Sequence, residues 1–232
     1  MDLSVFEKKI EVEFSDKNLL KTAMTHRSYL NENPPAGGGY AAHNERLEFL
    51  GDAVLELVIT EYLFKMFTDK PEGDLTSIRA SLVNANMLGN VAAELDFNRF
   101  LLLSRGEAKD VGRARQYIMA NAFEAVTGAI YLDRGYEAVK GFLLRVLSPK
   151  VSEIVERKLY RDAKSLFQEE AQERVSITPA YNVIKEWGPA HDKHFIVGVY
   201  LGKELVAEGE WPSKQEAQQQ AAENGLKQKG WD

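Results

Sequence analysis

Three carboxylates occur at helical spacing in the segment 44–52, where the chain carries its densest chemical signal. Glu45, Glu48 and Asp52 follow one another at steps of three and four, so on a helix they share one face. Like charges at this spacing destabilise a helix by roughly a few tenths of a kcal/mol per pair, and a bound cation would reverse that cost. The alternative is a solvated acidic face without a ligand, and spacing alone does not decide between the two.

A single carboxylate, Glu124, interrupts an otherwise uncharged and strongly apolar run from Ile118 to Leu132. A helix that is apolar around most of its circumference is buried, and a lone buried carboxylate is costly unless it pairs with a cation or binds a metal. Asn121 lies three residues earlier, on the same face. The run therefore indicates either a metal ligand or an ion pair, for which Arg46 and Arg79 are the candidate partners.

The composition restricts which metal these carboxylates could hold. The chain has no cysteine and only four scattered histidines, which excludes disulfides, a cysteine nucleophile and cysteine-based zinc sites. Carboxylate oxygens suit hard ions such as Mg²⁺. The net charge of −6 is unfavourable for a nucleic-acid ligand held by bulk charge alone. Such a ligand would need locally arranged groups and bound cations.

Helical patterns fill the first 150 residues and would position these carboxylates. Apolar periodicity predicts helices over 16–29, 44–67, 75–95, 118–132 and 136–146. Proline and glycine predict loops at 31–39, 69–74 and 106–112, and Gly135 closes the buried helix. The stripe expected to face the core, opposite the carboxylates, consists of Leu47, Leu50, Val54 and Leu57. We expect no strand here, so this part is predicted to be an all-α domain over residues 1–150.

A change in the residue pattern near residue 150, from apolar helical periodicity to a charged stretch, predicts a second domain. The charged stretch 151–160 is interpreted as a linker. Beyond it, a helical segment at 162–172 precedes three β-branched and aromatic runs, and a last helix spans 213–229. The expected strands are 180–184, 194–200 and 205–209. The order α-β-β-β-α predicts a small α+β domain over 161–230.

The run from His43 to Asp52, His-Asn-Glu-Arg-Leu-Glu-Phe-Leu-Gly-Asp, is similar to the signature of the ribonuclease III family. Further matching blocks follow in the family's order at 25–29, 72–76, 79–80 and 120–133. The C-terminal part resembles a double-stranded-RNA-binding domain in the blocks 167–169, 179–181, 188–195 and 213–222. The resemblance covers essentially the whole chain. It implies an all-α ribonuclease III endonuclease domain followed by an α+β double-stranded-RNA-binding domain.

The resemblance also implies an activity. It is that of an endoribonuclease that hydrolyses double-stranded RNA with a divalent metal, leaving 5′-phosphate and 3′-hydroxyl ends with short 3′ overhangs. The expected ion is Mg²⁺, with Mn²⁺ as a substitute, and no small-molecule cofactor is expected. Processing of ribosomal, messenger and other structured RNA precursors is the implied role. The chain has no signal-like or membrane-spanning run, so we expect a cytoplasmic location and no membrane partner.

The resemblance implies roles for individual residues, each assigned from the position that it matches in the family's motifs. Asp52 and Glu124 match the family's catalytic carboxylates, and the implied metal ligands are Glu48, Asp52, Asn121 and Glu124. Position 121 is often Asp in the family, and the Asn carbonyl can still ligate Mg²⁺ without adding charge. Further acidic positions of the family's cleft are Glu45, Glu72 and Glu107. The implied RNA contacts are Gln168, Glu169, His191, Ser213 and Lys214. His26 and His43 are interpreted as structural.

Phe49 matches the family's subunit-contact region. A symmetric homodimer would supply two active sites, one for each strand of the RNA. Without the resemblance, we would place an apolar side chain such as Phe49 in the core of the monomer.

Two other functions remain open on the sequence. A dimeric double-stranded-RNA-binding protein with a weak or inactive nuclease domain would fit Asn121 and the scarcity of basic residues. Residues 161–232 contain 9 Lys and Arg against 12 Asp and Glu, a net charge of −3, and Gln215 stands where the family usually has a second Lys. The three retained carboxylates favour a nuclease. A purely structural scaffold would leave Glu124 unexplained.

Overall fold

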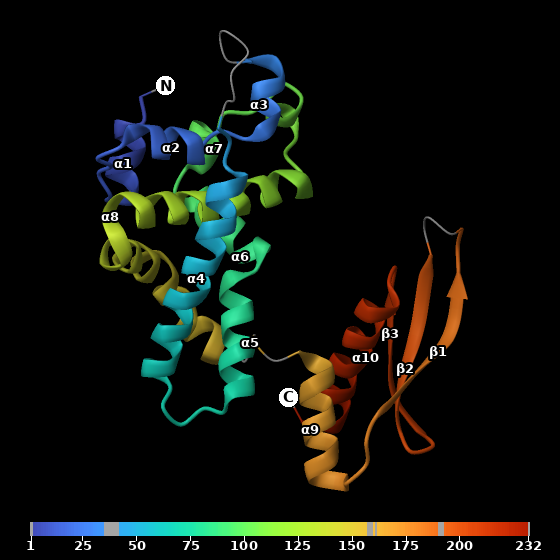
Figure 1. Ribbon diagram of the computed structural model, residues 1–232. Coiled ribbons are helices and arrows are strands. Elements are labelled where there is room, and N and C mark those ends of the chain that lie inside the picture. Colours follow the sequence, from blue (N-terminus) through green and yellow to red (C-terminus); the bar gives the residue numbers. More distant parts are fainter. Residues whose placement is uncertain (1, 35–41, 157–159, 161, 190–192, 232) are drawn as a thin grey trace. The chain divides into compact units, whose positions relative to one another are not determined.

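A computed structural model of the chain describes residues 2–34, 42–156, 160, 162–189 and 193–231 (Figure 1). These residues divide into two units, 1–160 and 161–232, and each is described by itself. Within the described residues, no helix is both long enough and apolar enough to span a membrane.

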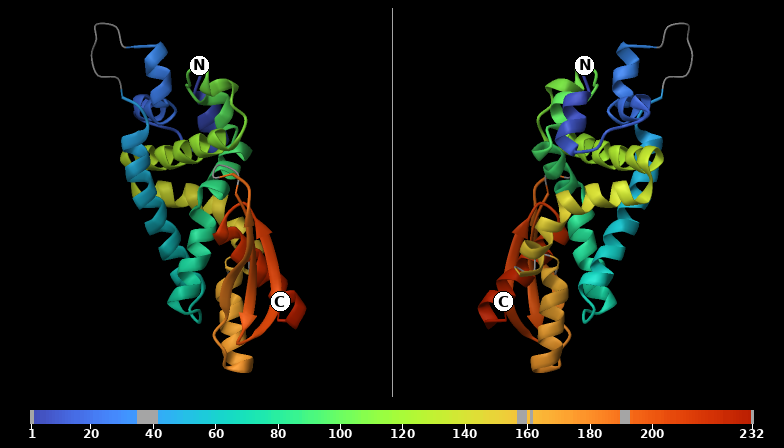
Figure 2. Two further views of the ribbon diagram at one scale, coloured as in Figure 1. Left: turned by 90° about the vertical axis from the view of Figure 1, so that its right-hand side faces the viewer. Right: turned by 90° about the vertical axis from the view of Figure 1, so that its left-hand side faces the viewer.

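The first unit is helical, as predicted. Its helices are α1 Ser4–Ile10, α2 Lys17–Ala23, α3 Arg27–Glu32, α4 Glu45–Met66, α5 Glu72–Val83, α6 Ala85–Glu94, α7 Phe97–Phe100, the 3₁₀ turn η1 Glu107–Lys109, and α8 Arg113–Glu156. Extended pairing among the described residues of this unit is limited to one isolated bridge between Thr25 and Leu102. The helices α4 and α5 run side by side in opposite directions, as Figures 1 and 2 show.

The long helix α8 consists of two arms that meet at Gly135. This glycine has φ 79° and ψ −177°, a conformation that L-residues rarely adopt, and it ends the first arm as the sequence predicted. The first arm carries the buried run around Glu124 and packs against α4 (Figure 1). The second arm, from residue 136 to 156, returns to cover the same core with Val139, Phe142 and Leu143.

Two predicted helices are each interrupted. The segment 16–29 forms α2 and α3, because the main chain of Met24 and His26 bonds to Leu102 instead of continuing the helix. The segment 75–95 forms α5 and α6, because Asn84 is extended and its side chain accepts the Met87 N–H to cap α6. In both cases a local polar or long-range main-chain contact outweighs apolar periodicity.

The predicted linker 151–160 differs from the structure. Helix α8 continues to Glu156, and Val151 and Ile154 are buried in the core of the first unit. They extend the apolar stripe of Leu147 at steps of four and three, which keeps the segment on the core despite its charges. Residues 157–159 lie outside the described part of the chain, as does the stretch 35–41 of the predicted loop 31–39.

Helix α4 has nearly the predicted bounds but not the predicted apolar stripe. Leu47 and Val54 are buried, whereas Leu57 is exposed, and the core side of the helix is completed by Leu55 and Val58. The carboxylates therefore do not lie opposite the core. Glu48 is half-buried at the margin of the core-facing side.

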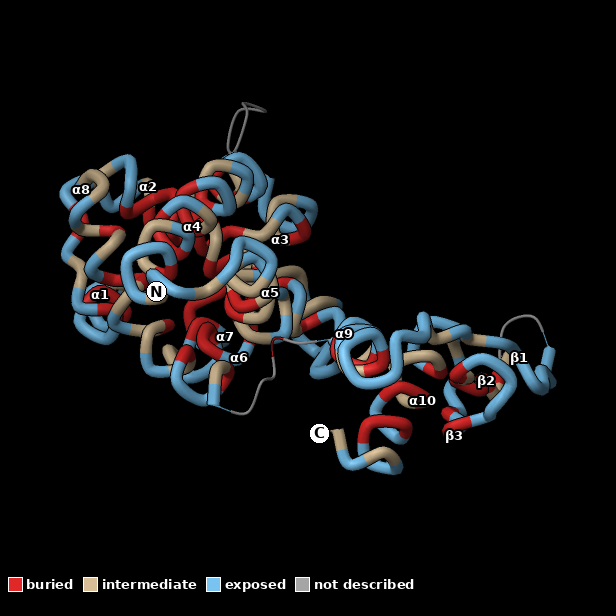
Figure 3. The backbone as a smooth tube through the Cα atoms, turned by 90° about the horizontal axis from the view of Figure 1, so that it is seen from below, coloured by how far each residue is buried: buried red, intermediate tan, exposed pale blue. Residues whose placement is uncertain are grey.

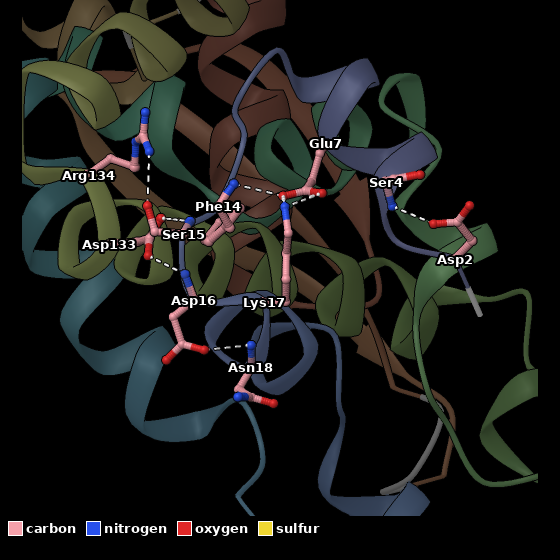
Figure 4. A network of polar contacts seen from close by, with 10 residues as sticks. All are labelled: Asp2, Ser4, Glu7, Phe14, Ser15, Asp16, Lys17, Asn18, Asp133 and Arg134. Atoms are coloured by element: carbon pink, nitrogen blue, oxygen red, sulfur yellow. Dashed lines mark hydrogen bonds and ion pairs between the residues drawn. The ribbon is translucent and has the colours of Figure 1, made fainter.

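Two carboxylates fasten the N-terminal segment onto the helical core (Figure 4). Glu7 is buried and accepts the Phe14 N–H at 2.7 Å and the Lys17 ammonium at 2.7 Å. Asp133, at the end of the first arm of α8, accepts the main-chain N–H groups of Ser15 and Asp16 at 2.7 and 2.8 Å. Asp16 in turn caps α2. These contacts hold the approach to α2 against α8.

The second unit has the predicted α-β-β-β-α order. Its elements are α9 Ala163–Val175, β1 Ala180–Trp187, β2 His194–Leu201, β3 Glu204–Trp211 and α10 Lys214–Lys229. The strands form an antiparallel sheet in the order β1-β2-β3, with Val197 opposite Val183 and Gly209. Helices α9 and α10 bury Phe167, Ala221 and Leu226 on their inner sides, and their other sides are exposed (Figure 3).

Candidate active site at the crossing of two helices

The candidate site forms where the main chains of α4 and α8 touch. A Cβ atom at Gly51 would lie 1.7 Å from the carbonyl oxygen of Glu124, and one at Gly128 would lie 2.3 Å from the carbonyl oxygen of Leu47. Only glycine permits so close an approach. Glu48 and Asp52 are within three residues of Gly51, so the contact brings them to Glu124, which is 72 residues away from Asp52 in the chain.

The electrostatics show that these carboxylates act on one another. The pKa of Glu124 is raised to about 7, chiefly by burial and in addition by the charges of Asp52 and Glu48. Burial also raises the pKa of Glu48, with additional contributions from Glu45 and Asp52, whereas a hydrogen bond with the side chain of Asn121 lowers it. The structure therefore brings together Glu48, Asp52, Asn121 and Glu124.

Glu124 lacks a neutralising cationic side chain among the residues that the structure describes. Within the described part of the chain, neither Lys nor Arg forms an ion pair with its carboxylate. Arg79, one predicted partner, instead pairs with Glu56 at 2.9 Å and donates to Thr60 at 2.8 Å. Arg46, the other, is exposed. A half-buried carboxylate without a counter-charge is the arrangement expected where a cation is supplied from outside the chain.

The donor set fits a hard divalent ion. Carboxylates and an amide carbonyl are oxygen ligands, and Asp52 is exposed to solvent. No group of three or more His, Cys, Asp or Glu side chains among the described residues converges on a ready-made metal position. Uncompensated carboxylates repel one another. An ion held by Asp52 and Glu124 would therefore complete its shell with the Asn121 amide, water or phosphate oxygens.

The three accessory acidic residues lie at different places. Glu45 is one turn before Glu48 and contacts the Arg27 guanidinium at 3.4 Å. Glu107 lies in η1, where its charge acts on His26. Glu72 begins α5 beside Thr60, about 18 Å along α4 from Glu48 at 1.5 Å per residue. A single chain therefore brings Glu45, but not Glu72, to the helix crossing.

The two histidines of this unit have different surroundings. His26 accepts the Ser28 N–H at 3.3 Å through Nδ1, caps α3, and has a pKa lowered chiefly by burial. His43 lies beside α4 with Nδ1 3.8 Å from the Glu45 carboxylate.

Phe49 is not in the core. Its side chain is 83% exposed on α4, so the expectation based on residue type alone is wrong. It lines a cleft of about 800 Å³, together with Leu19, Leu50 and Leu132. An aromatic side chain exposed to this extent beside an apolar cleft is a feature of protein-interaction surfaces.

The residues expected to contact RNA lie in the second unit. Gln168 and Glu169 are exposed on α9 along a shallow cleft of about 550 Å³. Ser213 accepts the Glu216 N–H at 3.2 Å and so caps the start of α10, and its hydroxyl donates to the Glu216 carboxylate at 2.7 Å. Lys214 is exposed beside it. His191 lies outside the described residues.

The structure adds Lys193 to this set. Its ammonium lies 5.8 Å from the ring centre of Phe195, and that of Lys214 lies 5.3 Å from the same ring. The two lysines are thus held near one another although the sequence separates them by 21 positions. Lys193 was not predicted from the sequence, because it comes near Lys214 only through the packing of the fold around Phe195.

Comparisons with known proteins agree with this organisation. A family model described as Ribonuclease-III-like matches residues 16–151, and one described as Double-stranded RNA binding motif matches residues 163–229. The chain is 45% identical over 229 residues to a protein named Ribonuclease 3 from Streptococcus pneumoniae, covering 99% of this chain and 97% of the relative. It is 44% identical over 225 residues to one of the same name from a Nitratiruptor species, covering 97% and 96%.

A solved structure also resembles the first unit. It is the nuclease domain of ribonuclease III from Campylobacter jejuni, described as flexible in a region involved in dimer formation. It is 40% identical with a TM-score of 0.57, covering 64% of this chain and 97% of that one. The chain therefore belongs to the ribonuclease III family of endoribonucleases, and its nuclease domain is followed in the sequence by a double-stranded-RNA-binding domain.

Proposed function

We propose that this protein is a Mg²⁺-dependent endoribonuclease that cuts double-stranded RNA at the crossing of α4 and α8. The products are expected to carry 5′-phosphate and 3′-hydroxyl ends with short 3′ overhangs. The observation that carries the proposal is Glu124, which is half-buried beside Asp52 and Glu48 and lacks a cationic partner among the described residues. Such a carboxylate is stabilised by a divalent ion.

Asp52 and Glu124 are the proposed catalytic ligands, assisted by Glu48 and Asn121. A bound Mg²⁺, for which Mn²⁺ can substitute, supplies an activated water and neutralises charge on the phosphate. Asp52 is exposed, so it can meet a phosphodiester arriving from solvent, whereas Glu124 is held by the packing of α8. Glu48 bonds to the Asn121 side chain and orients its amide. Asn121 contributes an oxygen but no charge, so we expect weaker metal binding than with Asp at this position.

The second unit is proposed to hold the duplex. A domain of this kind spans about 16 base pairs and contacts two minor grooves and the phosphates between them. Lys193 and Lys214 lie near one another around Phe195 and are placed to meet phosphate. Gln168 and Glu169 on α9, and His191, are proposed to reach 2′-hydroxyl groups. Lys193 also pairs with the Glu186 carboxylate at 3.2 Å, so Lys214 is proposed to supply most of the local positive charge that offsets the net charge of −3.

A homodimer is proposed to cut both strands. Phe49 and the cleft beside it form an apolar surface on α4, and the related nuclease domain from Campylobacter jejuni has a region involved in dimer formation. Two-fold symmetry would supply two equivalent sites, one for each strand. Glu45, Glu72 and Glu107 are proposed to line the RNA groove. Processing of ribosomal and messenger RNA precursors in the cytoplasm is the proposed role.

The decisive experiment compares two Glu→Gln variants on the same helix. Wild-type protein in Mg²⁺ should convert long duplex RNA to short duplex products, and chelation of the metal should stop the reaction. Glu124→Gln should slow cleavage by roughly 10²–10³-fold while the protein still retards RNA on a native gel. Glu137→Gln changes an exposed residue beyond Gly135 and should have no effect. Equal rates for the two variants would contradict the assignment of Glu124.

A second function is distinguished by the same assay. If the wild-type protein binds duplex RNA in Mg²⁺ and leaves it intact, the chain is a binding protein with an inactive nuclease domain. Asn121 is the observation that favours this alternative. Asn121→Asp should then create cleavage, whereas our proposal expects it to lower the Mg²⁺ concentration required for a reaction that is already present.

A further inference from the structure

Tyr117 is the one exposed residue in a long stretch of α8. Every other residue from Arg115 to Ile130 is buried or half-buried, while the side chain of Tyr117 is 47% exposed. Its hydroxyl makes no hydrogen bond with any residue in the described part of the chain, although neighbouring Gln116 bonds to Asn86 and Asn90 on α6. A large aromatic side chain is therefore presented to solvent from an otherwise covered helix.

The position of Tyr117 relates it to the candidate active site. Asn121 and Glu124 follow it at steps of four and three, which places all three residues on one side of α8. Along the helix axis, Tyr117 is about 6 Å from Asn121 and about 10 Å from Glu124. Arg113, another exposed residue, lies one turn further toward the start of α8 on the same side. The open side of this helix thus runs from the carboxylates to Tyr117 and Arg113.

We infer that Tyr117 contacts the ribose of a nucleotide next to the scissile phosphodiester and accepts or donates a hydrogen bond at its 2′-hydroxyl. The inference rests on the proposed function, because it takes the phosphodiester to lie at Asp52 and Glu124. Tyr117 lies about 10 Å from Glu124 along the helix axis, a distance that the phenol side chain and the ribose of a nucleotide next to a phosphate held there would span together. The assigned role is substrate contact, with no proton transfer.

The chemistry of the side chain suits this ligand. A-form RNA presents 2′-hydroxyls in a wide and shallow minor groove, where a phenol can reach them. A phenolic hydroxyl both donates and accepts, as a 2′-hydroxyl does. The contact would also contribute to the preference for RNA over DNA, because the 2′-hydroxyl is the group that differs.

The test is a double-mutant cycle between protein and substrate. Tyr117→Phe removes only the hydroxyl, and a set of duplexes carries a single 2′-deoxynucleotide at each of two positions on either side of the cleavage site. For the wild-type protein, one of these substitutions should raise KM about 3- to 10-fold with little change in kcat, the size of one lost hydrogen bond. For Tyr117→Phe, KM should be raised to the same extent with all-RNA substrate, and that deoxy substitution should cost nothing more.

Tyr131→Phe provides the matched control, because it removes another exposed tyrosine hydroxyl from the same arm of α8. It should retain the wild-type response to every deoxy substitution. The inference is overturned if the deoxy penalties in Tyr117→Phe equal those of the wild type at all four positions, while the wild-type protein still cleaves. If the wild-type protein fails to cleave in Mg²⁺, the proposed function fails, and this inference falls with it.

Discussion

The two units of this protein build their functional surfaces in opposite ways. In the first unit, the carboxylates are held at a contact between two helices whose main chains touch at Gly51 and Gly128. In the second, the RNA-facing candidates Gln168 and Lys214 are exposed side chains on the outside of a small α+β fold. The first surface depends on the packing of two main chains directly beside the carboxylates, and the second depends on individual exposed side chains. A given substitution should therefore have a larger effect in the first unit.

The largest effect is expected for Gly51→Ala. The new methyl group would overlap the carbonyl oxygen of Glu124, which belongs to the main chain and cannot rotate away. We expect a loss of stability of about 3 kcal/mol or more for the first unit, measured by urea unfolding, together with loss of cleavage. Gly141→Ala on the second arm of α8 meets nothing within 4 Å, and it should stabilise by roughly 0.5–1 kcal/mol. Similar free energies of unfolding for the two variants would contradict the conclusion that the contact between α4 and α8 holds the site together.

The next effect concerns the dependence of stability on pH. The pKa of Glu124 is raised from 4.5 to about 7, so the folded protein holds this proton more tightly than the unfolded chain does. The resulting stabilisation is present below pH 4.5 and is lost as the pH rises through about 7. In chelator, Glu124→Gln should therefore gain stability over the wild type between about pH 5 and about pH 8. Thermal unfolding measures this difference, and a constant difference across this range would contradict it.

Added Mg²⁺ sharpens the same comparison. The ion binds the deprotonated site of the folded protein, so it should raise the melting temperature of the wild type at about pH 8 more than at about pH 5. Glu124→Gln should show little of this response. The second unit, which offers no such pH-shifted carboxylate cluster among its described residues, should not contribute to it.

A smaller effect is expected in the second unit. Replacing Lys193 and Lys214 by Ala should weaken binding to duplex RNA and lower the slope of log K against log salt by about 1 for each lysine. Lys203→Ala lies beyond the other end of β2, a strand about 26 Å long, and should leave the slope unchanged. Binding titrations at several salt concentrations give the slopes. A change of equal size for Lys203→Ala would show that RNA binding depends on overall charge.

The smallest effect is expected for Ser213→Ala. The Ser213 hydroxyl is engaged with both the N–H and the carboxylate of Glu216, so its loss should cost about 1 kcal/mol of stability in the second unit. RNA affinity, measured where the variant is fully folded, should change little. A strong loss of affinity with unchanged stability would instead make Ser213 a direct RNA contact.

Local signals predicted much of the fold. Helix α4 has nearly the predicted bounds, and the second unit has the predicted α-β-β-β-α order, with Asp162 and Ser213 capping the starts of its two helices. These features depend on neighbouring residues, so the sequence contains them. The break at Met24 was missed because it depends on main-chain bonds to Leu102, which is remote in sequence. The break at Asn84 was missed because the apolar pattern continues across this capping residue. Apolar periodicity alone does not report such contacts.

The site was only partly predictable. The spacing of Glu48 and Asp52 and the isolation of Glu124 could be seen in the sequence, but a solvated face for the first two and an ion pair for Glu124 remained as alternatives. What joins them is the approach at Gly51 and Gly128, two glycines inside apolar helical runs. Those glycines are the signal that could have predicted a close helix contact. The exposure of Phe49 was not predictable from its type, because an apolar residue on a helix is placed in the core by default.

The contact at Gly51 and Gly128 also bears on how such a chain can change over time. Because two backbones set the spacing of the carboxylates, exchanges among the surrounding aliphatic side chains should alter the interior without displacing the ligands. Substitutions in the hydrophobic core are thereby uncoupled from the positions of the catalytic carboxylates. During evolution, most core side chains could be replaced while the two glycines stay unchanged.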